Sequence, residues 1–128
     1  MKLKIFTLFL LTTVLLTLTA IASDGVNKRL KFARGKSSTV VSGAVVRGDR
    51  DTYRLGAKSG QKMTVKITST ENNAVFQIQD ANGNFLAGAD EGDDAMRWSG
   101  ELPSNGDYKI IVGGTRGNAA YKLTVSIK

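Results

Sequence analysis

Apolar and polar residues alternate along most of the chain after residue 27. The alternation is clearest over residues 121–127, where every second residue is apolar, and it recurs over residues 63–67. Successive side chains of a strand point to opposite faces of a sheet, so this spacing predicts strands with one buried face. No segment after residue 22 has apolar residues at helical spacing over three turns, and we expect no helix there.

Turn-forming residues separate these stretches. Asn82-Gly83 is a typical hairpin turn, and most of the 14 glycines fall at such positions, where a positive φ is needed. The pattern predicts an all-β fold, an antiparallel and jelly-roll-like β-sandwich of about eight strands. We expect the last strand to lie inside its sheet, because an apolar strand at an open edge favours aggregation. The predicted core contains Tyr53, Phe76, Ile78, Ile110, Val112, Leu123 and Val125.

The first 22 residues have the order of a secretory signal peptide. Two lysines precede an apolar run over residues 5–18, and small residues at Ala20 and Ala22 then supply a cleavage site. We expect cleavage after Ala22 and a β-sandwich domain over residues 23–128, located in the periplasm or secreted, with no stable membrane anchor. An uncleaved anchor is the alternative, because the apolar run is long for a signal core.

The composition excludes several kinds of chemistry. The chain has no histidine and no cysteine, which removes Ser-His-Asp and Cys-His catalysis, most zinc sites and any disulfide framework. We expect that the protein is not an enzyme and that it binds no cofactor and no metal. The acidic run over residues 90–94 offers oxygen ligands for calcium, but it lacks the spacing of a calcium loop, and a solvated loop is the other interpretation. The glycine-rich residues 113–118 precede a strand, so no helix is there to bind a phosphate.

Charge is unevenly distributed along the chain, whose formal net charge is +7. The segment from Lys28 to Lys66 holds eleven basic residues and only two acids, Asp49 and Asp51. Residues 71–107 hold eight acids and a single basic residue. Outside the cytoplasm a positive surface meets an acidic protein cleft or an anionic envelope polymer, and we expect no nucleic acid as a partner.

One arginine lies at a predicted hairpin turn. Arg116 is flanked by small residues between the last two predicted strands, so its side chain should be presented to a partner instead of packed. A guanidinium forms paired hydrogen bonds with a carboxylate, which makes Arg116 a candidate contact for an acidic site. The alternative is an exposed arginine that serves only solubility.

Several short motifs follow one another in a recognisable order: residues 32–38, Ser42-Gly43, residues 51–53, residues 57–62, Leu102-Pro103 with Gly106 and Tyr108, and Thr115-Arg116 with Asn118. Together they resemble the periplasmic inhibitors of goose-type lysozyme, over nearly all of the mature chain. A broader set of jelly-roll modules, similar to the domains that follow secreted peptidases, shares the Asp-x-Tyr and Leu-Pro-x-x-Gly-x-Tyr elements.

The resemblance implies a β-sandwich that plugs the substrate cleft of a lysozyme, with a protein as its partner. The partner-binding residues that it suggests are Arg116, Thr115 and Asn118, joined by Tyr53, Ser42 and Lys36 if these lie at the same end of the sandwich. A stand-alone module that binds carbohydrate or cell-wall polysaccharide is the alternative. It would need exposed aromatic side chains, and we expect Trp98 to pack in the core. A structural role without a tight partner is the third hypothesis.

Overall fold

The computed structural model describes residues 25–128, so the predicted signal peptide lies outside the described residues. Within that range there is no helix, and hence none that is long and apolar enough to cross a membrane. The strands are β1 (Asn27–Arg29), β2 (Ser38–Val45), β3 (Asp51–Ala57), β4 (Lys62–Ser69), β5 (Ala74–Gln79), β6 (Arg97–Glu101), β7 (Gly106–Gly114) and β8 (Ala119–Ile127).

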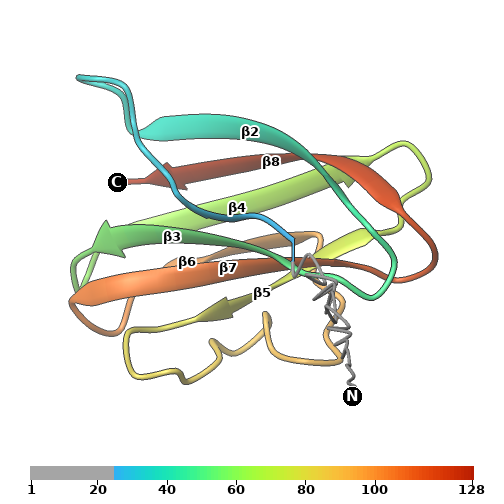
Figure 1. Cartoon of the computed structure of the whole chain (residues 1–128). Coiled ribbons are helices and arrows are strands. Elements are labelled where there is room, and N and C mark those ends of the chain that lie inside the picture. The colour runs from blue at the N-terminus through green and yellow to red at the C-terminus, as the bar shows by residue number, and fades with distance from the viewer. Residues whose placement is uncertain (1–24) are drawn as a thin grey trace, which may run out of the picture.

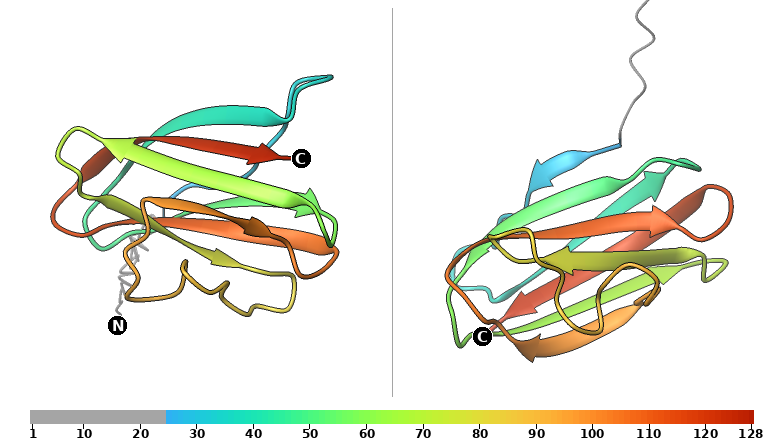
Figure 2. Two further views of the ribbon diagram at one scale, coloured as in Figure 1. Left: turned by 180° about the vertical axis from the view of Figure 1, so that it is seen from behind. Right: turned by 90° about the horizontal axis from the view of Figure 1, so that it is seen from below.

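Two four-stranded sheets pack face to face as a β-sandwich (Figures 1 and 2). The first sheet has the strand order β1-β3-β7-β5, and the second has the order β2-β8-β4-β6. All neighbouring strands are antiparallel except β1, which pairs in parallel with β3. The predicted all-β sandwich is therefore confirmed, and β8 lies between β2 and β4 as its uninterrupted apolar alternation indicated.

The core lies between the two sheets and follows the alternation of the sequence. In β8 every second side chain, from Ala119 to Ile127, is buried. Burying one large aliphatic or aromatic side chain contributes roughly 1.5–3 kcal/mol, so a continuous inner face on each sheet can hold this cysteine-free domain together. All seven predicted core residues are buried: Tyr53, Phe76, Ile78, Ile110, Val112, Leu123 and Val125.

The connection between β5 and β6 contains no strand. Phe85 forms a single β-bridge with Gln79, and the chain then passes through a series of turns instead of a strand. Leu86 is nevertheless buried. Trp98 on β6 is half-buried against the core, and its indole Nε1 donates a hydrogen bond of 2.9 Å to the carbonyl oxygen of Ala87. Separate backbone hydrogen bonds, among them those from Leu86 to Ile78 and from Phe76 to Ala95, also hold the connection against β5, without forming a continuous strand ladder.

A chain of buried hydrogen bonds joins β3 and β8. The carboxylate of Asp51, which is 1% exposed, accepts a hydrogen bond from the Tyr121 hydroxyl at 2.6 Å and one from the Val26 backbone N–H at 2.8 Å. The hydroxyls of Tyr121 and Tyr53 lie 2.6 Å apart. Gly43 on β2 leaves the space for this chain, since a Cβ there would lie 2.5 Å from the Tyr121 hydroxyl. A buried carboxylate is tolerated because both of its oxygens are hydrogen-bonded.

Candidate functional site

Three turns meet at one end of the sandwich, and each of them carries the chain from one sheet to the other (Figure 1). They are the β2–β3 turn (residues 46–50), the β4–β5 turn (residues 70–73) and the β7–β8 turn (residues 115–118). Two of these turns present exposed arginines, Arg47 and Arg50 on the first and Arg116 on the last. We call this surface the arginine end.

A buried asparagine fixes the β7–β8 turn against the β4–β5 turn. Asn73 is 3% exposed, and its side-chain Nδ2 donates hydrogen bonds of 3.0 Å to the carbonyl oxygens of Arg116 and Asn118. Its own carbonyl oxygen accepts a hydrogen bond of 2.9 Å from the Thr115 backbone N–H. Because a buried amide is costly unless it is hydrogen-bonded, this geometry strongly favours one conformation of the turn.

The side chain of Arg116 is exposed but held in place. Its Nη2 donates a hydrogen bond of 2.8 Å to the backbone carbonyl of Glu71 on the neighbouring turn. A guanidinium carries five N–H donors, so most of its capacity is left for a partner. The β2–β3 turn is tied to the same structure, because the side-chain Oδ1 of Asn118 accepts a hydrogen bond of 2.7 Å from the Arg47 backbone N–H.

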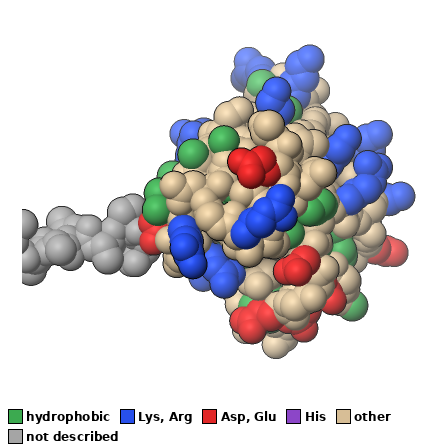
Figure 3. All heavy atoms as spheres, turned by 90° about the vertical axis from the view of Figure 1, so that its right-hand side faces the viewer, with side chains coloured by type: hydrophobic (Ala, Val, Ile, Leu, Met, Phe, Trp, Pro, Cys, Tyr) green, Lys and Arg blue, Asp and Glu red, His purple; other side chains and the backbone are tan. Residues whose placement is uncertain are grey.

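The side chain of Arg50 lies against Gly113 of β7, a residue that has no side chain of its own. A Cβ on Gly113 would lie 3.2 Å from the Cδ and 3.4 Å from the Nε of Arg50, so the glycine permits this close approach. Beside it is a groove of about 300 Å³ whose lining includes Glu91 and Asp94. The arginine end therefore has an acidic margin, and Figure 3 shows acidic side chains gathered at the lower edge of this face with basic ones above.

Comparison with known proteins decides the family. No family model matches the chain. A curated protein of Escherichia coli K12, named an inhibitor of g-type lysozyme, is 35% identical over 114 residues, which cover 89% of this chain and 79% of that protein. The chain belongs to the g-type lysozyme inhibitor family.

Solved structures agree with this membership. The Aeromonas hydrophila periplasmic inhibitor of g-type lysozyme, PliG, is 31% identical with a TM-score of 0.69, over 80% of this chain and 96% of that one. A mutant of the Escherichia coli PliG is 26% identical with a TM-score of 0.66, over 81% and 99% of the two chains. The pre-peptidase C-terminal domain of a Bacillus anthracis collagenase is 19% identical with a TM-score of 0.58, over 81% and 96% of the two chains, and shares the fold.

The structure brings three of the six predicted contact residues of this inhibitor-family protein together. Arg116, Thr115 and Asn118 all lie on the β7–β8 turn. Ser42 lies on β2, three residues before the strand reaches that end, which is about 10 Å along the strand. Lys36 is at the opposite end, in the loop before β2, next to the point where Ser37 accepts a hydrogen bond from the end of β8.

Tyr53 is a core residue and not a surface contact. Its side chain is only 2% exposed, and its hydroxyl is hydrogen-bonded to that of Tyr121. Its place in the predicted core is confirmed, whereas a direct contact with a partner is inconsistent with this burial. The motif that contains Tyr53 therefore supports the fold beneath the arginine end.

Sequence reasoning did not single out Arg47, Arg50 or Asn73. The two arginines flank Gly48-Asp49, which are residue types typical of turns, so a search for arginines beside such residues could have found them. Asn73 had no comparable signal, because its importance comes from its burial and its partners across the turns. Those partners follow only from the order of strands in the two sheets.

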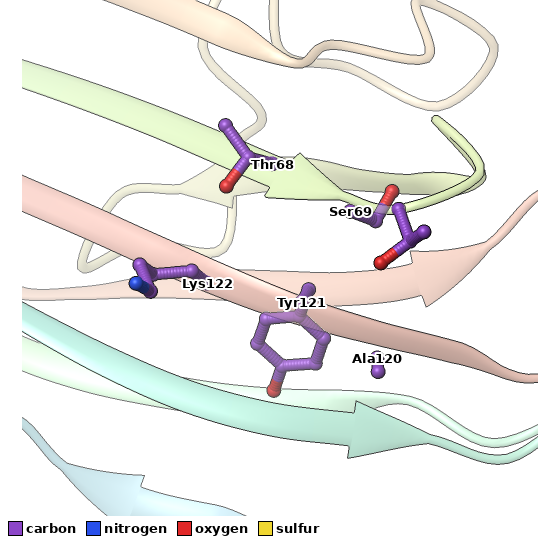
Figure 4. A pocket seen from close by; sticks show the side chains of 6 residues that line it. Thr68, Ser69, Ala120, Tyr121 and Lys122 are labelled. Carbon is purple, nitrogen blue, oxygen red and sulfur yellow. The ribbon is translucent and has the colours of Figure 1, made fainter.

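Sugar-binding and metal-binding features are weak over residues 25–128. None of the aromatic side chains in this range is fully exposed, so no row of rings is available for stacking against a sugar. A depression of about 410 Å³ over β4 and β8 is lined by hydroxyls and Lys122, and Figure 4 shows the Tyr121 ring directed away from Thr68 and Ser69. Residues 25–128 contain no group of three or more acidic side chains placed to hold a metal ion.

Proposed function

We propose that this protein is a periplasmic inhibitor of g-type lysozyme and that the arginine end binds the enzyme, with Arg116 entering its substrate cleft. Membership of the family and the names of its relatives support the inhibitor function and the periplasmic location. The predicted signal peptide over residues 1–22 agrees with export. The observation that supports the binding surface most directly is an exposed Arg116 on a turn that Asn73 fixes from below.

The chemistry of lysozyme explains how an arginine inhibits it. A glycoside hydrolase of this kind depends on a carboxylic acid that donates its proton to the sugar oxygen. A guanidinium placed against that carboxyl group favours its ionised form, which has no proton to donate. The two groups also form paired hydrogen bonds, so Arg116 both occupies the cleft and disables the acid.

Arg116 needs neighbours to give tight inhibition. Truncating one partner of a buried charge pair costs about 2–5 kcal/mol, whereas a dissociation constant of 1 nM requires about 12 kcal/mol. Arg47 and Arg50 on the adjoining turn extend the positive surface and favour approach to an acidic cleft. The hydrogen bonds from Asn73 already order the turn in the free protein, so the turn loses less conformational entropy when it binds lysozyme.

The test compares Arg116→Ala with a matched control. Arg34→Ala removes the same side chain from an exposed position at the opposite end of the sandwich, in the loop before β2. In calorimetric titrations with g-type lysozyme, Arg116→Ala should weaken binding by about 2–5 kcal/mol, and Arg34→Ala should have little effect. Arg116→Lys should restore only part of the affinity, since lysine cannot form two parallel hydrogen bonds.

Two results would contradict the proposal in different ways. If Arg34→Ala weakened binding as much as Arg116→Ala, the contact would be a general charge effect and the arginine end would not be the binding surface. If the unmodified protein left the lysis of cell walls by g-type lysozyme unchanged at micromolar concentration, the inhibitor function itself would be wrong.

A further inference from the structure

The second sheet has an open edge along β2. Among residues 25–128 this strand pairs only with β8, and no strand from that range lies beyond it (Figure 1). The Ile127 backbone N–H donates to the carbonyl oxygen of Ser37, which fixes the alternation of hydrogen-bonded pairs between the two strands. By that alternation, four residues direct their N–H and C=O groups away from β8 toward the open edge: Ser38, Val40, Ser42 and Ala44.

This edge lacks the features that normally prevent pairing with another chain. Edge strands are usually short, or carry a charge, a proline or a bulge. β2 has eight residues, Ser-Thr-Val-Val-Ser-Gly-Ala-Val, with no charge and no proline. Val40 is 54% exposed, and the small side chains of Ser42, Gly43 and Ala44 leave room for a backbone to approach.

A groove of about 520 Å³ lies beside the open edge. Its apolar surface comes from Leu30, which is buried, and from Val41, which packs against the core. Lys28 and Lys31 line it as charged residues from β1 and the segment that follows. A strand added to β2 would direct every second side chain toward this groove, so the site would select apolar residues at alternate positions.

Charge indicates which kind of strand fits. Residues 28–48 contain six basic residues and no acid. Arg29 forms an ion pair of 2.6 Å with Asp107, and this is the one ion pair among residues 25–128. A second copy of the chain would bring the same positive charges to the same edge, and like charges oppose that pairing. An acidic strand would be attracted to it.

We propose that the open edge of β2 and the adjoining groove bind an extended, acidic peptide segment of a partner protein as an added β-strand. Main-chain hydrogen bonds to the four outward-facing residues provide the affinity, and the groove provides the preference for apolar residues at alternate positions. The net positive charge of residues 28–48 favours acidic residues at the positions between them. The site is separate from the arginine end and does not depend on lysozyme binding.

The experiment uses two proline variants at equivalent edge positions. Ser42→Pro removes an outward-facing N–H from β2, and a proline is tolerated at an edge where the N–H faces solvent. Ser99→Pro is the matched control on β6, the other edge of the same sheet. Hydrogen bonds from Ile67 to Met96 and from Leu102 to Gln61 fix the β4–β6 alternation, by which the Ser99 N–H also points away from its neighbour strand. The probe is a fluorescein-labelled octapeptide, Glu-Val-Asp-Val-Glu-Val-Asp-Val, and circular dichroism verifies that both variants fold.

The proposal predicts a specific set of results. Fluorescence polarisation should show that the wild-type protein, Ser99→Pro and Arg116→Ala bind the octapeptide alike, and that Ser42→Pro binds at least tenfold more weakly. The amide protons of Val40, Ser42 and Ala44 should exchange more slowly with the peptide bound. Replacing both Lys28 and Lys31 by glutamate should weaken binding by about tenfold.

Three results would overturn it. Equal binding by Ser42→Pro would mean that the basic surface attracts any polyanion without strand pairing. Equal loss in Ser99→Pro and Ser42→Pro would mean that the effect is not specific to the β2 edge. No binding of the octapeptide, with self-association that Ser42→Pro abolishes, would assign the edge to a second copy of this chain.

Discussion

Gly43 allows a direct measurement of how much the buried Asp51–Tyr121–Tyr53 chain contributes to stability. A Cβ at this position would lie 2.5 Å from the hydroxyl oxygen and 2.7 Å from the Cζ of Tyr121, and 3.1 Å from the hydroxyl of Tyr53. Carbon atoms in contact normally lie about 3.5–4.0 Å apart, so the Tyr121 ring would have to move by about 1 Å in Gly43→Ala.

The cost of Gly43→Ala follows from two effects. Overpacking a core by a methyl group costs about 1–3 kcal/mol. Moving the Tyr121 hydroxyl also lengthens its 2.6 Å hydrogen bond to the buried Asp51 carboxylate, and a hydrogen bond to a charged group contributes about 1.5–3 kcal/mol. We expect the free energy of unfolding, measured with urea at pH 7, to fall by roughly 2.5–6 kcal/mol, which lowers the melting temperature of a domain this size by about 10 °C or more.

Two further variants test the cause. Gly56→Ala is the matched control, because a Cβ there would meet only the Asp107 carboxylate oxygen, at 3.6 Å, and we expect a change within about 1 kcal/mol. Tyr121→Phe removes the nearest atom, so in that background Gly43→Ala should cost about 1–2 kcal/mol less than in the wild type. A cost below about 1 kcal/mol, or the same cost in both backgrounds, would refute this reasoning.

Further predictions concern the turns and the titrating groups. Asn73→Ala removes two hydrogen bonds to the β7–β8 turn, so the free energy of unfolding should fall by about 1–3 kcal/mol and amide hydrogen exchange in that turn should become faster. Hydrogen bonds from Arg29 lower the pKa of the Asp107 carboxyl group. The stability that this pair contributes is therefore present above the pKa of Asp107 in the unfolded chain and is lost as the pH falls through its pKa in the folded protein. Arg29→Ala should restore an ordinary pKa to Asp107 in an NMR titration. Burial raises the pKa values of Tyr121 and Tyr53, so the stability that they contribute is present below about pH 10 and is lost as pH rises further. An ultraviolet titration of the folded protein in which both tyrosines form phenolate with an ordinary pKa, near 10, would contradict this.

The strands and the core could be predicted from the sequence because one-sided burial produces an alternation of period two. β8 shows this most directly, and the same alternation placed Tyr53 in the core. The connection after β5 could not be predicted in the same way. Its path depends on single residues in turns, including Asp94 at a φ of 48°, and on Trp98 from a later strand, neither of which produces a periodic pattern.

The candidate site was predicted only as far as local signals reach. An arginine at a glycine-flanked turn identified Arg116, but Lys36 proved to lie at the other end of the molecule. Which turns share an end depends on the order of strands in each sheet, and that order is set by contacts between distant segments. The support that Asn73 gives to the β7–β8 turn spans more than forty residues of sequence, as the separation of 43 between Asn73 and Arg116 shows.

The position of β7 and β8 at the centres of the two sheets has a consequence for synthesis. These strands come last among the eight of the described part of the chain. Within that part, β2 has no sheet partner except β8, and β3 and β5 are joined only through β7. The first sheet cannot be completed until β7 has left the ribosome, and the second cannot be completed until β8 has left it, so the growing chain stays without its full tertiary structure for most of its translation. That order of strands is compatible with the export that we propose, because a chain without stable tertiary structure can still be carried across a membrane.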